Sequence, residues 1–201
     1  MYTINDIIRV ADEKFNETEF VGRLIPERLE ITSTIITVEN SGVSREIPIV
    51  TEWTCAADNI LVFNKIDSCL GLIAHSSDGN LLCGAHFSLP TDFFNNQTDS
   101  AKQTLGKIIG AYIVAMKTAG YVNFTSFGGS VSEWNGYSND CLRNEEVTEI
   151  TGDLNQKNWY FSIEQGQMAV NYWPSEIEGT KETEEKEGKE SEKEEVKSEE
   201  E

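Results

Sequence analysis

One β-hairpin constrains this chain more than any other local pattern. Apolar runs at residues 69–74 and 81–89 flank the tetrapeptide Ser77-Asp78-Gly79-Asn80. Asp-Gly between two apolar runs is the strongest short-range hairpin signal, because the turns that match the strand twist need residues that tolerate positive φ. If this dipeptide lies at the centre of the turn, Gly71 faces His86 across the two strands. The sequence therefore predicts both the hairpin and its register.

This register brings a cysteine and a histidine to one face of the sheet. Side chains alternate along a strand, so Cys69 shares a face with His86 as its diagonal neighbour, with Cβ atoms about 7 Å apart. Gly71 lies between them and is expected to leave room for the imidazole to lean across. An imidazole that accepts the thiol proton raises the reactive thiolate fraction, so the pair predicts nucleophilic catalysis. The structural alternative is a buried cysteine that packs as a small apolar side chain, beside a histidine that satisfies one hydrogen bond.

A zinc site is a second alternative, because zinc prefers the ligand types found at Cys69, His75, Cys83 and His86. The hairpin argues against it. Cys83 and His86 are three positions apart on one strand, so their side chains should point to opposite faces of the sheet. His75 lies six positions after Cys69, too far along the strand to share a metal ion with it. We therefore expect neither a metal nor another cofactor.

The remaining pattern predicts an α+β fold with antiparallel sheets and one long helix. Two helices are expected, at 4–15 and at 100–119 before Gly120, with a third, short one at 144–151. Expected strands are 29–38, 46–51, 59–63, 121–127, 159–163 and 168–172, the first two forming a hairpin around 39–42. We divide the chain into an N-terminal extension (1–55), one domain (56–174) and a tail (175–201).

Charge excludes some classes of partner. Residues 175–201 hold 13 Glu and 5 Lys with only Ile177 and Val196 as large apolar side chains, so we expect a disordered acidic tail. A docking segment for a basic partner is the alternative reading of this tail. The rest of the chain keeps 22 acidic and 11 basic residues, which argues against nucleic-acid binding. No apolar run is long enough for membrane insertion. Four irregularly spaced cysteines predict a cytoplasmic protein, or else a secreted effector without a signal peptide.

Residues 66–90 read IDSCLGLIAHSSDGNLLCGAHFSLP, with His86 17 positions after Cys69. This segment resembles the core motif of CheD-type chemoreceptor glutamine deamidases, in which a Gly-Ser-Cys turn precedes a short hairpin and Gly-x-x-His-x-x-Leu-Pro. Ser68-Cys69 and the run from His86 to Pro90 match it, and the Cys–His separation is the family's own. The helix followed by Phe127-Gly128-Gly129-Ser130 is also similar, as is Leu142-Arg143-Asn144. The resemblance covers roughly residues 60–172.

The resemblance implies a protein-glutamine deamidase with Cys69 as nucleophile and His86 as acid and base. It also implies a layered α/β/β sandwich with the long helix packed on the sheet. The substrate would be a glutamine-bearing chemoreceptor or, as in bacterial toxin deamidases of the same architecture, a host protein. Gly128, Gly129 and Ser130 would lie against the substrate chain, although a simple turn explains the glycines equally well.

The chain departs from the family pattern at several positions. Asp67 replaces the usual glycine, and the family's third catalytic residue, a threonine, falls on Phe63. Asn64 or Ser68 could substitute for that threonine. The family's terminal glycine-rich segment is reduced to residues 165–167. These departures leave a non-catalytic CheD-like interaction module as the alternative function.

Overall fold

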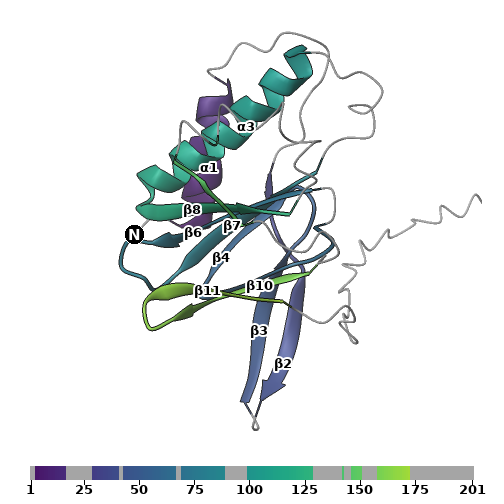
Figure 1. Cartoon of the computed structure of the whole chain (residues 1–201), viewed down its shortest axis with the longest axis vertical. Coiled ribbons are helices and arrows are strands. Elements are labelled where there is room, and N and C mark those ends of the chain that lie inside the picture. The colour runs from purple at the N-terminus through teal and green to yellow at the C-terminus, as the bar shows by residue number, and fades with distance from the viewer. Residues whose placement is uncertain are drawn as a thin grey trace, which may run out of the picture.

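The computed structural model describes residues 3–16, 29–40, 43–66, 69–88, 99–128, 142, 146–150 and 158–172. The expected tail at 175–201 lies outside these residues. Within them the chain forms two helices and two sheets (Figure 1). The elements are α1 (Ile4–Asn16), β1 (Glu30–Ile31), β2 (Ile35–Asn40), β3 (Val43–Val50), β4 (Thr54–Asp58), β5 (Ile60–Phe63), β6 (Leu70–Ser76), β7 (Leu82–Phe87), α3 (Asp99–Thr118), β8 (Tyr121–Phe127), β9 (Thr148–Ile150), β10 (Trp159–Glu164) and β11 (Gln167–Tyr172).

Both sheets are mixed. The six-stranded sheet has the order β1-β4-β7-β6-β8-β9 and the five-stranded sheet the order β11-β10-β5-β3-β2. The α+β class is confirmed, but the expectation of antiparallel sheets is wrong, because β1–β4, β3–β5 and β8–β9 are parallel pairs. After β3, which belongs to the five-stranded sheet, the chain forms β4 in the six-stranded sheet, and then forms β5 beside β3 in the five-stranded sheet. This excursion replaces the direct hairpin that would have made β3 and β5 antiparallel.

Two large apolar layers pack the helices and the two sheets together, and a smaller buried cluster joins β2, β3 and β5. In Figure 1 the helices lie on one side of the six-stranded sheet, and β10 and β11 lie on the other. The first layer packs α1 and α3 on the sheet through buried side chains that include Ile7, Tyr112 and Leu72. The second lies between the two sheets and is rich in aromatic rings, among them Phe63 and Phe127. Elements of the expected extension 1–55 contribute to these layers and sheets.

Two expected elements differ from the structure. The expected strand 29–38 is split into β1 and β2, which belong to different sheets. Between them the Thr32 hydroxyl donates to Ile49 O (2.6 Å) and accepts from Thr34 N–H (3.2 Å), so a local side-chain hydrogen bond bends the chain. The expected short helix at 144–151 is also wrong over its described part. Residues 148–150 form β9 beside β8, where Ile150 packs against the inter-sheet layer.

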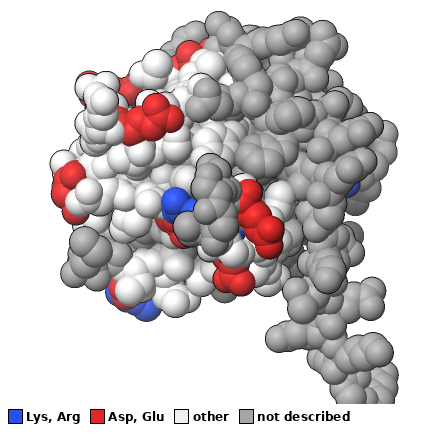
Figure 2. All heavy atoms as spheres, turned by 90° about the horizontal axis from the view of Figure 1, so that it is seen from below, with Lys and Arg blue, Asp and Glu red and all other residues white. Residues whose placement is uncertain are grey.

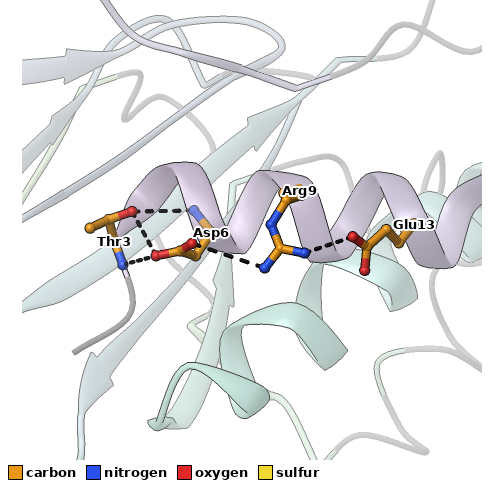
Figure 3. Close-up of polar contacts among 4 residues, drawn as sticks. All are labelled: Thr3, Asp6, Arg9 and Glu13. Carbon is orange, nitrogen blue, oxygen red and sulfur yellow. Dashed lines mark hydrogen bonds and ion pairs between the residues drawn. The ribbon is translucent and has the colours of Figure 1, made fainter.

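Both described helices begin and end close to their expected limits. Ile108, Ile109, Tyr112, Ile113 and Met116 form the buried face of α3. Thr3 caps α1 through a reciprocal pair of hydrogen bonds with Asp6, and Arg9 bonds with Glu13 one turn further on (Figure 3). Among the described helices, none is long and apolar enough to cross a membrane.

Candidate active site

The β6–β7 hairpin has the register that the sequence predicts. Gly71 pairs with His86, and the same offset holds along the whole ladder. Ser76 N–H donates to Leu81 O (2.7 Å), so the loop is wider than the expected two residues. Gly79 within it has φ 70°. Because the wider loop is centred on the same dipeptide, the register of the strands is unchanged.

Cys69 and His86 lie on the face of the six-stranded sheet that is turned toward the five-stranded sheet. Cys69 and Leu82 belong to the inter-sheet layer. His86 lies four positions after Leu82 on β7, so strand alternation places it on the same face. Cys83, by contrast, packs with the helices in the other layer. The two groups proposed for chemistry therefore share one face of the sheet.

Both groups are buried. His86 has none of its surface exposed, and Cys69 keeps 4%. Cys55 and Cys83 have none. Among the cysteines that the structure describes, Cys69 is therefore the one that keeps some exposed surface.

Phenylalanine rings fill the space beside His86. A Cβ atom at Gly71 would lie 2.2 Å from Cζ of Phe127, and one at Gly84 would lie 2.5 Å from Cζ of Phe63. Phe127 reaches this position from β8, where it pairs with Gly71. The expectation that Gly71 leaves room for the imidazole to lean across is therefore wrong. A missing side chain in a close-packed interior is replaced by a neighbour, and here the neighbour is an aromatic ring.

The segment before Cys69 is held from two other parts of the chain. Lys65 has φ 59°, a left-handed conformation that is uncommon for residues with a side chain. Its N–H donates to Oδ1 of Asn158, which lies just before β10 (3.1 Å). Gly128, at the end of β8, lies so close that a Cβ there would be 2.0 Å from Cγ2 of Ile66 and 3.1 Å from Cys69 O. Gly128 itself has φ 72°, so glycine is required there for both reasons.

The other predicted site residues are placed as follows. Asn64 directly follows β5 and is half-buried, and its backbone N–H donates to Val50 O (3.4 Å). Phe63 is fully buried, with ring centroids 4.8 Å from Phe127 and 5.6 Å from Phe161. Ser68, Gly129 and Ser130 lie outside the described residues. Sequence reasoning missed Asn158 because 93 residues separate it from Lys65 and no motif marks it.

The remaining described cysteines are unsuited to nucleophilic chemistry. Burial raises the pKa of the Cys55 thiol to about 12, and burial likewise raises the pKa of Cys83. The Cys83 sulfur lies 3.3 Å from the Tyr112 hydroxyl in the helix-side layer. His75 bonds instead with the side-chain amide of Asn123 (2.8 Å). The zinc quartet is thus not brought together, and in the described parts of the chain no three metal-ligating side chains gather.

Acidic groups dominate the described surface in one view. Figure 2 shows the face seen from below, where Asp and Glu side chains are scattered with few Lys or Arg side chains between them. This agrees with the formal net charge of −19.

Together these features define an α+β protein in which two mixed sheets enclose a cysteine and a histidine. Comparison with known proteins adds no family to this description. No protein-family model matches the chain, and a search of curated proteins finds no match.

Proposed function

We propose that this chain is a protein-glutamine deamidase that uses Cys69 as nucleophile and His86 as general base and acid. The observation that carries the proposal is the pairing of Gly71 with His86, which turns His86 to the face that holds Cys69. The described layers, helices on one sheet and a second sheet behind it, also suit the α/β/β sandwich that the CheD-type resemblance implies.

The reaction needs one thiol, one imidazole and water. The Cys69 proton moves to His86 as the sulfur attacks the carboxamide carbon, and backbone N–H groups, that of Cys69 among them, hold the oxyanion. The C–N bond then breaks, and the nitrogen takes the proton from His86 and leaves as ammonia. His86 next accepts a proton from water as the hydroxide attacks the thioester. The C–S bond breaks, glutamate is released and the sulfur regains its proton.

The burial of the pair fits a narrow substrate group. Cys69 has 4% of its surface exposed and His86 has none, so a narrow group suits this site better than a wide one. A glutamine carboxamide sits at the end of a slim, flexible stem and can enter where a backbone cannot. We therefore assign the substrate as a glutamine side chain of another protein, either a chemoreceptor or a host protein. Gly128, Gly129 and Ser130 would lie along the substrate chain, and Asn64 or Ser68 would replace the family's threonine.

The test is mass spectrometry of a partner before and after incubation with the purified chain. The wild type should release ammonia from a receptor cytoplasmic fragment and convert glutamine to glutamate, in the cytoplasmic chemotaxis setting that the resemblance implies. Cys69→Ser should abolish both signals. Cys83→Ala is the matched control, because it removes a buried thiol from the opposite face and should keep activity. Ammonia release retained by Cys69→Ser would remove Cys69 from its role.

One observation favours a second function, a non-catalytic interaction module with the same fold. Phe63 stands where the family has a catalytic threonine, and its fully buried ring packs against other aromatic rings. Iodoacetamide discriminates between the two functions. In a deamidase the imidazole raises the thiolate fraction of Cys69, so His86→Ala should slow the alkylation of Cys69 at neutral pH, whereas in a binding module that rate should stay unchanged.

A further inference from the structure

The segment that delivers Cys69 contains a conformation that needs external support. Asn64 N–H is bonded to Val50 O (3.4 Å), and the next residue, Lys65, adopts φ 59°. A non-glycine residue in this region persists only where the surrounding structure over-determines it, and such residues cluster at functional sites. Lys65 lies four positions before Cys69, and Leu70, the first residue of β6, follows Cys69 directly.

Asn158 supplies that support at the point where a β-ladder stops. β10 pairs with β5 as far as Trp159 opposite Phe63. The next rung would join Asn158 to Asn64 through their backbones. Instead the Asn158 side-chain oxygen accepts the N–H of Lys65 (3.1 Å), and Asn158 is 8% exposed. A side chain thus replaces the backbone acceptor and allows the chain to turn away from the sheet.

Gly128 holds the same segment from the other side. Its Cα lies against Ile66, which is 1% exposed, and against the Cys69 carbonyl, with no room for a Cβ. The segment is therefore held between β10 and β8. Of the two contacts, the Asn158 bond is the polar one, and it acts on the strained residue directly.

We propose, on the basis of the proposed deamidase function, that Asn158 is a positioning residue. By accepting the Lys65 N–H it keeps the left-handed turn that brings the Cys69 thiol to the imidazole of His86. Asn158 acts through its hydrogen bond to the Lys65 backbone and touches no substrate.

The test is the pH dependence of Cys69 alkylation by iodoacetamide in the full chain. The pH at which the alkylation rate is half-maximal reports how strongly the imidazole favours the Cys69 thiolate. The maximal rate at high pH reports how accessible the thiolate is to the reagent. Asn158→Ala should move that pH upward and lower the thiolate fraction at neutral pH by about fivefold to tenfold, since one hydrogen bond shifts a local equilibrium by about that factor. In deamidation kcat should fall by a similar factor while KM stays unchanged.

A second substitution separates positioning from general damage. Lys65→Gly removes the penalty for positive φ, so in the Asn158→Ala background it should return the titration to within about twofold of wild type. Asn123→Ala is the matched control, because it also removes one asparagine side-chain hydrogen bond, the one between Asn123 and His75, but lies at the far end of β8. If Asn158→Ala does not fold, Asn158→Ser repeats the test. The serine hydroxyl is on a shorter side chain and should not reach the Lys65 N–H.

Two results would overturn the inference. The first is that Cys69 in both Asn158→Ala and Asn158→Ser is alkylated with the same pH dependence as in the wild type. The second is that Lys65→Gly, added to Asn158→Ala, does not reverse the upward shift in the pH of half-maximal alkylation. The proposed function fails separately, when the wild type releases no ammonia from any glutamine-bearing partner. The pH dependence of Cys69 alkylation is measured without substrate. It therefore tests whether Asn158 positions Cys69 even if the chain proves not to be a deamidase.

Discussion

Replacement of Gly71 by alanine tests the packing beside His86. The added Cβ would lie 2.2, 2.3 and 2.7 Å from three atoms of the Phe127 ring, so the ring must retreat by about 1 Å to reach van der Waals contact. It has nowhere to go, because the centroids of Phe63, Trp159 and Phe161 lie 4.8, 5.0 and 4.6 Å from its own. Overpacking of a close-packed core costs about 1–3 kcal/mol, and a ring confined on several sides belongs in the upper half of that range. We expect Gly71→Ala to lower Tm by about 5–10 °C.

Thermal unfolding followed by circular dichroism measures this loss. Phe127→Leu removes the clashing ring atoms, so the double variant with Gly71→Ala should lose less stability than the sum of the two single losses. Gly166→Ala is the matched control, because no atom lies within 4 Å of its Cβ position and only its φ of 76° opposes the change. Its cost should stay near 1 kcal/mol. A Gly71→Ala chain as stable as the wild type would refute the described position of Phe127.

Two further predictions concern ionisable groups. Hydrogen bonds from Thr3 hold the pKa of the Asp6 carboxyl below its ordinary value of 3.8, so its contribution to stability is present above about pH 4 and is lost as the pH falls through the folded pKa. Asp6→Asn should therefore lower Tm at neutral pH but not at about pH 2, and an equal loss at both in thermal melts would contradict this. Cys55, with a pKa raised to about 12, should stay unmodified by iodoacetamide at about pH 8 while Cys69 reacts. Peptide mapping checks this, and equal labelling of both thiols would exclude the selective reactivity.

The local part of the fold could be predicted from the sequence. The β6–β7 register follows from one Asp-Gly dipeptide and from strand alternation, both of which are readable within twenty residues. The loop is wider than two residues, but it is centred on the same Asp-Gly dipeptide, so Gly71 still pairs with His86. The helices were also predictable, because their apolar residues recur at helical spacing and a glycine follows α3.

The non-local part could not be predicted. Thr32 divides one β-rich run between two sheets by a hydrogen bond to Ile49, and nothing in the run itself marks that residue as a corner. The Phe127 ring over Gly71 and the Asn158 bond to Lys65 join residues more than fifty positions apart. Local propensity carries no information on such contacts. For this reason the sequence did not predict that the Phe127 ring fills the space over Gly71, nor that Asn158 binds the backbone of Lys65.

The aromatic layer itself bears on what the Cys69–His86 pair is for. Phe63 and Phe127 fill the places of the side chains missing at two glycines on the His86 face, so the imidazole lies in an apolar, water-poor layer. If packing alone mattered, an apolar side chain of similar shape at position 86 would be at least as stable, because a buried polar group gains little net free energy even when hydrogen-bonded. The same apolar setting strengthens hydrogen bonding and proton transfer between groups that do meet there. The proposal that His86 acts on the Cys69 thiol gives this fully buried imidazole a role that packing alone does not, and Cys69 keeps some exposed surface where the other described cysteines keep none.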